Sequence, residues 1–250
     1  VDGRVRAAEA VFDRLHFADV VLQGRAGPGE IAVDQLAFVF AGGRTAATAA
    51  VRAATLASHV VVTLDFTGTD VGQLARMLGG ATDEIAGRLD GGLRLQMTGA
   101  TVFDALANSH AQAVLAMSSG RVARALLERA STDLRALFRK GEGSAALLCL
   151  LGIVDLHDGI GKIAPLRLRT ADTSLIGAGQ VDLLRQRLDL IVKGEASSGL
   201  ALNLPLRISG PIDDLDVSPA LGSSIVRPAA HMPALQADLQ HLAAGNACLH

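Results

Sequence analysis

The chain has 250 residues, of which 50% are hydrophobic, and this is enough for one large β domain or two small ones. Its 23 Lys and Arg residues nearly balance 25 Asp and Glu residues, and no basic run could neutralise a row of phosphates, so nucleic acid is excluded as an expected partner. Trp and Tyr are absent, so aliphatic side chains must line whatever the fold encloses, and sugars and bases are poor candidate ligands.

Two further general features concern membranes and cysteines. No stretch of about 18 apolar residues free of charge occurs, and Val1 does not open a signal peptide, so we expect no membrane-spanning helix in this chain. The two cysteines, Cys149 and Cys248, allow a single disulfide in an oxidising compartment. Their spacing alone leaves open whether they are bridged.

Alternating hydrophobicity predicts strands in the first half of the chain. Apolar residues occupy every second position over 60–66, and side chains two apart in a strand share one face. Leu93, Leu95 and Met97 repeat this alternation. Between these strands, Thr69 and Asp70 can cap a short helix near 70–80, which the glycines at its end would stop.

Helical patterns then interrupt the alternation twice. Thr101 and Asp104 resemble a capping box, although Asp is not its preferred acidic residue, and predict a short helix through about His110. Apolar residues three or four apart over 121–140 predict a longer helical insertion.

The alternation returns in the second half. It marks strands at 166–168, 188–192 and 200–208, and the last of these alternates Leu200, Leu202, Leu204, Leu206 and Ile208 with smaller or polar residues. Pro205 cannot donate to a ladder, so this strand should lie at an edge or turn that nitrogen outward. The tail over 221–250 is expected to be helical in part, with Pro233 at the start of one segment.

Glycine-containing turns separate the predicted strands. They are expected at Gly27-Pro28-Gly29, Gly42-Gly43, Asp90-Gly91-Gly92, Asp158-Gly159 and Gly177-Ala178-Gly179. Short strands joined in this way indicate an antiparallel meander rather than βαβ units. The predicted fold is therefore mainly β with a few helices. Its organisation is a β domain over 1–220 with helical insertions near 70–80, 101–110 and 121–140, followed by the helical tail over 221–250.

No catalytic, cofactor or metal site is predicted. The histidines form no recognised ligand spacing, and Asp155, His157 and Asp158 are interpreted as solvated groups at a turn. The segment 177–182 lacks the third glycine of a dinucleotide fingerprint, and Cys149 lies in a run too apolar to stabilise a thiolate. Asp213, Asp214 and Asp216 occupy a Pro-flanked turn, where a general acid would lack the burial that raises its pKa. A non-enzymatic protein is expected.

The region from Cys149 to Pro219 resembles the C-terminal part of the AsmA family, envelope proteins of Gram-negative bacteria. The similar features are a strand entering the turn Asp158-Gly159, a segment Gly177-Ala178-Gly179-Gln180-Val181-Asp182-Leu183, the triplet Leu188-Asp189-Leu190, and Pro205-Leu206-Arg207-Ile208-Ser209-Gly210. Upstream, 36–43, 66–71 and 87–99 follow the family order, so the resemblance covers most of the chain. Thr98-Gly99-Ala100-Thr101 departs from the Gly-x-Gly-x-Ser-like segment that is more usual there.

The resemblance implies a curved antiparallel sheet with a hydrophobic groove that helices cap or plug. It further implies a periplasmic protein attached to the inner membrane through an N-terminal anchor that this chain lacks. A cysteine after Asn or Asp near the C-terminus is common in the family, and Asn246-Ala247-Cys248 is similar to it. The oxidising setting that the resemblance implies favours a Cys149–Cys248 disulfide.

The resulting hypothesis is a domain that shelters phospholipid acyl chains for transport between the inner and outer membranes and for outer-membrane homeostasis. The lipid-facing candidates are Leu93, Leu95, Met97, Leu202, Leu204 and Leu206. For each residue taken singly, an alternating Leu is more often ordinary core. The alternative is a scaffold that assists outer-membrane protein assembly without carrying lipid, using the amphipathic segments 121–140 and 233–244 to contact other envelope proteins.

Overall fold

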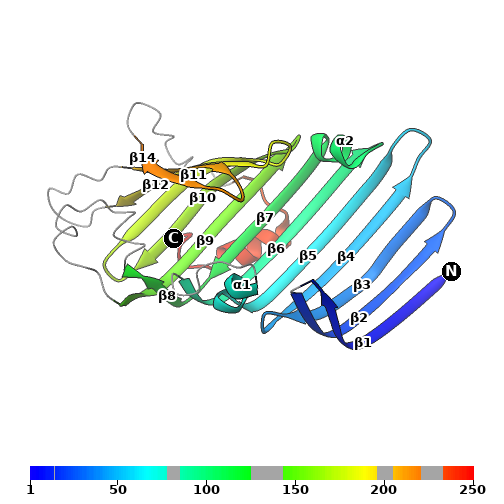
Figure 1. Cartoon of the computed structure of the whole chain (residues 1–250), viewed down its shortest axis with the longest axis horizontal. Helices are drawn as coiled ribbons and strands as arrows, with labels where there is room; N and C mark the ends of the chain where they lie inside the picture. The colour runs from blue at the N-terminus through cyan, green and yellow to red at the C-terminus, as the bar shows by residue number, and fades with distance from the viewer. Residues whose placement is uncertain (14, 78–84, 125–142, 196–204, 221–232) are drawn as a thin grey trace.

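The computed structural model describes residues 1–13, 15–77, 85–124, 143–195, 205–220 and 233–250. One antiparallel sheet of 14 strands dominates it, as Figure 1 shows, which confirms the predicted fold class of mainly β structure with few helices. The described elements are β1 (Asp2–Phe12), β2 (Leu15–Gly27), β3 (Glu30–Phe40), β4 (Gly43–Ala53), β5 (Ser58–Asp70), α1 (Val71–Met77), β6 (Ile85–Gly99), α2 (Val102–Ala107), β7 (Ser109–Met117), β8 (Gly120–Ala123), β9 (Ser144–His157), β10 (Ile160–Thr170), β11 (Ser174–Asp182), β12 (Arg187–Glu195), β13 (Leu206–Pro211), β14 (Asp216–Pro219) and α4 (Ala237–Ala244).

The strands follow one another across the sheet in chain order, except that β9 pairs with β7 and the short β8 pairs with both β6 and β9. The pairings are antiparallel, so tight turns suffice to join most neighbouring strands. In Figure 1 the last strands turn away from the plane of β2–β7, so the sheet is curved. The strand register fixes which side chains share a face across its full width.

The sheet has two chemically different faces. Leu64, Leu93 and Ala113 are cross-strand neighbours on one of them, which we call the groove face. Thr63 and Arg94, one position away along the same strands, lie on the opposite face. We call that the helix face because α4 packs there, behind the sheet in the view of Figure 1.

The helix face carries the larger buried cluster. Val114, Ala116, Cys149, Leu151 and Ile153 of the sheet pack against Leu239, Ala243 and Cys248 of the C-terminal segment. Leu239 is 1% exposed and Ala243 is fully buried, because α4 presents both to the strands. The C-terminal segment therefore completes the core on this side of the sheet.

A second buried cluster lies on the groove face near the C-terminal strands. It contains Val122, Ala145, Leu175, Leu190 and Val192, from β8, β9, β11 and β12. Strands that are not adjacent in the sheet thus contact one another across the groove face here. The curvature closes this part of the face and leaves the part over β1–β7 more open.

The two short helices follow β5 and β6 directly and therefore lie at opposite ends of β6. Asp70 accepts a hydrogen bond from Gln73 N at 2.8 Å at the start of α1, and Thr101 Oγ1 accepts one from Asp104 N at 3.1 Å at the start of α2. Helix α2 ends at Ala107, before His110, which belongs to β7. A Cβ atom on Gly99 would lie 2.2 Å from Ala105 N, so α2 crosses the end of β6 in close contact.

Two of the predicted turns are wrong, because their glycines lie inside strands. Gly91 and Gly92 are in β6, where a Cβ atom would lie 2.3 Å from the Phe66 ring and 2.6 Å from a Leu239 methyl, respectively. Gly179 is in β11, and its Cβ would lie 2.1 Å from Asp189 O. These glycines allow close packing of neighbouring elements rather than a reversal of the chain.

Other expectations differ at their boundaries or fall outside the described residues. Residues 121–123, predicted as helix, belong to β8, and the rest of that segment from 125 to 140 is not described. Strand β13 begins at Leu206, after Pro205, and it lies between β12 and β14 rather than at an edge. In the tail, the described helix begins at Ala237, four residues after Pro233, while 221–232 is not described.

Candidate functional site

The groove face carries an uninterrupted apolar row across the whole sheet. Following the cross-strand partners from β1 to β14, one residue from each successive strand of the sheet order, the row reads Val5, Leu22, Leu36, Ala47, Leu64, Leu93, Ala113, Val154, Ile163, Gly179, Leu190, Ile208 and Val217. We call this the central row. It contains no polar or charged side chain.

Two neighbouring rows extend the apolar surface. One contains Val33, Ala49, Val62, Leu95, Ala111, Leu156, Gly161, Val181 and Leu188, and the other contains Phe38, Thr45, Phe66, Gly91, Leu115, Gly152, Leu166, Gly177, Val192 and Leu206. Thr45 is the one polar member of these sets. Together the three rows make a broad apolar surface along which a linear apolar ligand could lie.

The position one residue away shows the opposite chemistry. On the helix face the corresponding row reads Thr48, Thr63, Arg94, Gln112, Asp155, Lys162, Gln180, Asp189, Ser209 and Asp216. Every member is polar or charged. Along these rows a single residue of register therefore separates polar from apolar side chains, because successive side chains in a strand point to opposite faces. The buried cluster beneath α4 is the apolar part of the helix face.

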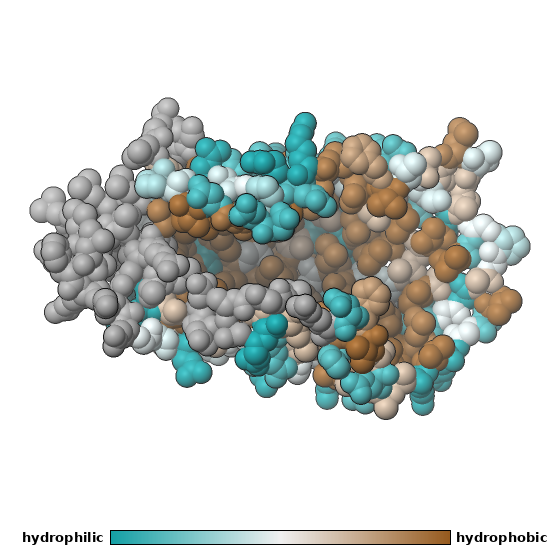
Figure 2. Space-filling model, viewed as in Figure 1, coloured by the Kyte–Doolittle hydropathy of each residue, from teal (hydrophilic) through white to brown (hydrophobic). Residues whose placement is uncertain are grey.

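The central row is only partly covered by the protein itself. Leu190 is its one buried member, at 9% exposure, and Val5 and Val217 are each 56% exposed. The other members of the row are half-buried. Figure 2 shows this face as a hollow lined with hydrophobic residues. With about 25 cal/mol for each Å² of apolar area, exposed side chains on this scale leave a substantial driving force for an apolar ligand.

The dimensions of this surface follow from the sheet geometry. Neighbouring strands lie 4.7–4.9 Å apart, so twelve steps between the strands of the central row give about 58 Å along the curved sheet. The backbone N–H and C=O groups beneath this surface are hydrogen-bonded to one another between the strands, so they are not free to bind a polar ligand. The surface is therefore suited to long, chain-like apolar molecules and offers nothing to fix a compact polar one.

The predicted lipid-facing residues fall on this surface where the structure describes them. Leu93, Leu95 and Met97 are half-buried on β6, next to Leu64, Val62 and Val60 of β5. Leu206 is on the same face but only 9% exposed, at the closed part near the second buried cluster. Leu202 and Leu204 lie outside the described residues.

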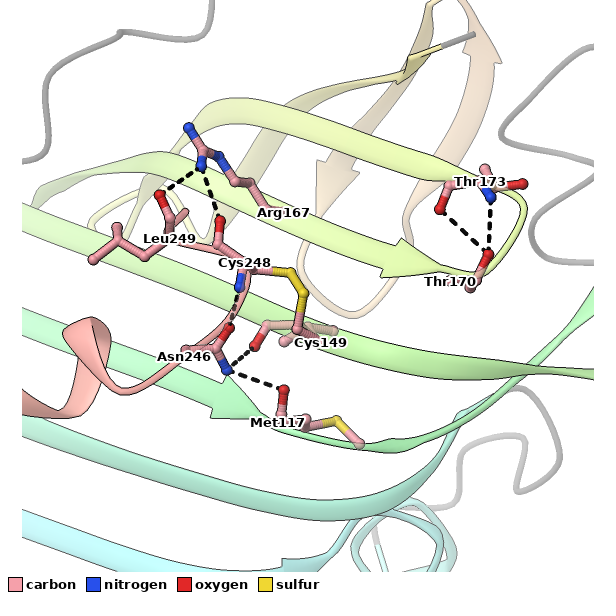
Figure 3. Close-up of a disulfide and its surroundings, with 9 residues drawn as sticks. Met117, Cys149, Arg167, Thr170, Thr173, Asn246, Cys248 and Leu249 are labelled. Atoms are coloured by element: carbon pink, nitrogen blue, oxygen red, sulfur yellow. Dashed lines mark hydrogen bonds between the residues drawn. A yellow bond between two sulfur atoms is a disulfide. The ribbon is translucent and has the colours of Figure 1, made fainter. Parts of the chain in front are cut away.

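The two cysteines lie on the helix face and form a disulfide. The Cys149 and Cys248 sulfurs are 2.06 Å apart, and both residues are buried, at 0% and 1% exposure (Figure 3). Asn246 holds the same segment: its Nδ2 donates to Met117 O at 3.0 Å and Leu150 O at 3.1 Å, and its Oδ1 accepts from Cys248 N at 2.9 Å. This arrangement fixes the chain terminus against the sheet and is structural rather than nucleophilic.

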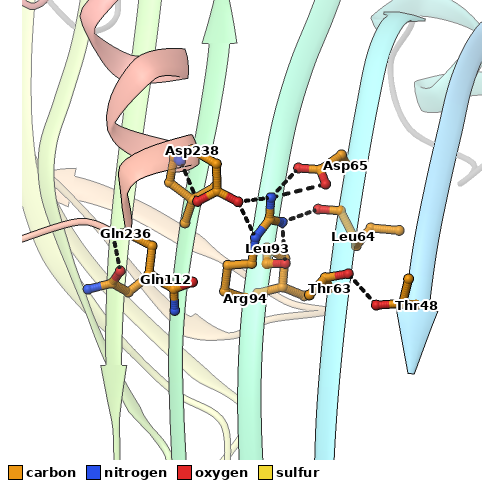
Figure 4. A network of polar contacts seen from close by, with 10 residues as sticks. Thr48, Thr63, Leu64, Asp65, Leu93, Arg94, Gln112, Gln236 and Asp238 are labelled. Atoms are coloured by element: carbon orange, nitrogen blue, oxygen red, sulfur yellow. Dashed lines mark hydrogen bonds and ion pairs between the residues drawn. The ribbon is translucent and has the colours of Figure 1, made fainter. Parts of the chain in front are cut away.

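An ion-pair network ties α4 to the helix face. Arg94, whose side chain is 10% exposed, donates to Asp65 at 2.8 Å and to Asp238 at 2.5 Å (Figure 4). The hydrogen bond from Arg94 lowers the pKa of Asp238 below its ordinary value of 3.8. Gln112 adds a second tie, since its amide oxygen accepts from Gln236 N at 2.9 Å and its amide nitrogen donates to Ala234 O at 2.8 Å.

Two shallow cavities of about 350 and 360 Å³ lie over β10–β13 and share Gln180 and Asp189. Asp189 accepts two hydrogen bonds from Arg207, at 2.7 and 2.6 Å, which lower the pKa of Asp189. Because the Asp189 carboxylate is paired with the Arg207 guanidinium, the edge that the two cavities share carries no unpaired carboxylate. The first cavity is lined mainly by polar and charged residues, and the second also borders Ile163 and Gly179 of the central row.

Three carboxylates that the sequence set aside lie near the end of the sheet. Asp213 and Asp214 are exposed in the turn between β13 and β14, and Asp216 is exposed at the start of β14. Among the described residues, no group of three or more His, Cys, Asp or Glu side chains is arranged to hold a metal ion. No helix in the described ranges is both long and apolar enough to span a membrane.

Comparisons with known proteins identify no relative of this chain. No family model matches the chain, and neither the curated proteins nor the solved structures contain a significant match. The resemblance to the AsmA family thus depends on the sequence patterns alone.

Proposed function

We propose that this protein is a non-enzymatic domain that shelters phospholipid acyl chains on its groove face. The observation that carries the proposal is the central row, apolar from β1 to β14 and half-buried along most of its length. Moving a sixteen-carbon chain into water costs roughly 12 kcal/mol at about 0.8 kcal/mol per methylene. A continuous apolar surface offsets this cost along the whole path, which isolated pockets would not do.

The proposal includes the setting that the AsmA resemblance suggests. It is transport of phospholipid between the inner and outer membranes and maintenance of the outer membrane, by a periplasmic domain attached to the inner membrane. The Cys149–Cys248 disulfide supports an oxidising compartment, because such bonds persist where thiols are not kept reduced. The scarcity of aromatic residues supports an aliphatic ligand over a sugar or base.

Native mass spectrometry of the purified protein tests the proposal. We expect phospholipid to co-purify with the wild type and to be lost when Leu95→Asn places an amide on the groove face. Gln96→Asn, one residue along β6 and exposed on the helix face, is the matched control and should retain lipid. A lipid-free wild type, or equal lipid content in both variants, would contradict the proposal.

A scaffold for outer-membrane protein assembly is a second candidate, favoured by strand β1. Its 11 residues pair with β2 on one side, and within the described residues no strand pairs with its other side. An open edge of this length can accept an extended segment through backbone hydrogen bonds. Protein bound to a lipid-free chain in the same mass spectra would favour this candidate.

A further inference from the structure

Two histidines from neighbouring strands meet on the helix face, away from the groove. His110 of β7 and His157 of β9 are direct cross-strand partners. Their Nδ1 atoms are 2.9 Å apart, and their ring planes meet at 68°. The interpretation of Asp155, His157 and Asp158 as a solvated turn did not include His110, which lies 47 residues upstream of His157.

Asp155 fixes the proton position of this pair. Its Oδ2 lies 3.2 Å from His157 Nε2, and a carboxylate can only accept, so Nε2 of the neutral ring carries the proton. The lone pair of His157 is therefore on Nδ1, the atom that faces His110. A carboxylate that accepts from the far nitrogen is the usual outer partner of a metal-binding histidine.

We propose that His110 and His157 form a two-histidine site for a divalent transition-metal ion, with highest affinity for Cu(II). Two nitrogens that bind one ion at 2.0–2.1 Å in adjacent positions at a right angle are about 2.9 Å apart, whereas a tetrahedral angle would separate them by about 3.3 Å. The observed 2.9 Å between the two Nδ1 atoms is a hydrogen-bond distance, and it is close enough to these separations that small ring rotations bring both nitrogens within reach of one ion. Among divalent first-row transition-metal ions, Cu(II) binds nitrogen sites most tightly.

Binding requires small, balanced changes. The proton that His110 donates in the hydrogen-bonded pair moves to its own Nε2, so both Nδ1 lone pairs reach the metal and no net proton is released. The two exposed rings rotate about χ2, a broad torsion, to point these lone pairs at one ion. Water completes the coordination, since the described part of the chain supplies no third His, Cys, Asp or Glu ligand there.

Copper titration of the untagged protein, followed by calorimetry and by electron paramagnetic resonance, tests the site. We expect a Cu(II) signal with two nitrogen ligands and weaker Zn(II) binding, with Ca(II) showing none. His110→Ala or His157→Ala should weaken this binding at least tenfold, and Asp155→Asn by about tenfold because it frees the His157 tautomer. His59→Ala is the matched control, an exposed helix-face histidine bonded to Thr98, and should leave binding unchanged.

The outcomes separate a metal site from a hydrogen-bonded surface pair. Equal Cu(II) affinity in the wild type and His110→Ala, or a signal with a single nitrogen ligand, would overturn the proposal. So would the absence of saturable binding. Both rings are exposed, so circular dichroism should show that the variants fold, and metal binding does not depend on whether the groove carries lipid.

Discussion

Removing the disulfide should cause a large loss of stability with little change in the folded structure. The double variant Cys149→Ala/Cys248→Ala opens a loop whose ends are separated by 99 residues. Chain entropy assigns about 4.7 kcal/mol to closing a loop of about 100 residues, and removal of native disulfides typically costs 2–5 kcal/mol. We expect the free energy of unfolding to fall by about 3–5 kcal/mol.

Urea denaturation followed by circular dichroism measures this loss. The α4 segment should stay docked in the folded variant, because Asn246, Arg167 and the buried Leu239 still hold it. Wild-type protein reduced while unfolded and then refolded under reducing conditions is the control and should match the double variant. A fall below about 1 kcal/mol with an unchanged slope would refute the entropic reasoning.

Three further predictions concern the helix face and the close contacts of the sheet. Asn246→Ala should lower the free energy of unfolding by about 1–3 kcal/mol in urea denaturation, because it leaves the carbonyls of Met117 and Leu150 without this donor; a neutral result would contradict the assigned bonds. The lowered pKa of Asp238 adds stability that is present at neutral pH and lost as the pH falls through and below 3.8. Amide exchange should therefore show α4 opening at a higher pH than the strands of the sheet, and Asp238→Asn should remove this pH dependence. Gly91→Ala should cost about 1–3 kcal/mol through overlap with the Phe66 ring, whereas Gly3→Ala, with open space at its Cβ, should be nearly neutral in the same thermal melts.

The fold could be predicted from the sequence wherever a single local pattern determines the secondary structure. Alternation over 60–66 and 93–97 gave strands β5 and β6 their faces, because one buried face forces every second residue to be apolar. The glycine pattern predicts turns at 90–92 and 177–179, but these glycines lie inside β6 and β11, since a glycine is typical of both turns and closely packed strands. Only the approach of Phe66 and Leu239, from distant parts of the chain, explains Gly91 and Gly92.

The site was predictable in kind but not in extent. Leu93, Leu95 and Met97 could be assigned to one face from their spacing, whereas Ala47, Ala113 and Gly179 of the central row carry no hydrophobic signal of their own. These residues belong to the central row because of the cross-strand register. Bulges in β2, β3 and β10 each shift that register by one residue. The His110–His157 pair was hidden for the same reason, since it depends on the pairing of β7 with β9.

Site-specific photo-crosslinking in cells tests the central claim most directly. A photoreactive residue at Leu95 places its probe on the groove face, and the same residue at Gln96 places it on the helix face of the same strand. We expect phospholipid adducts at position 95 and none at position 96. Equal capture at both positions, or a folded protein that captures no phospholipid at position 95, would contradict it.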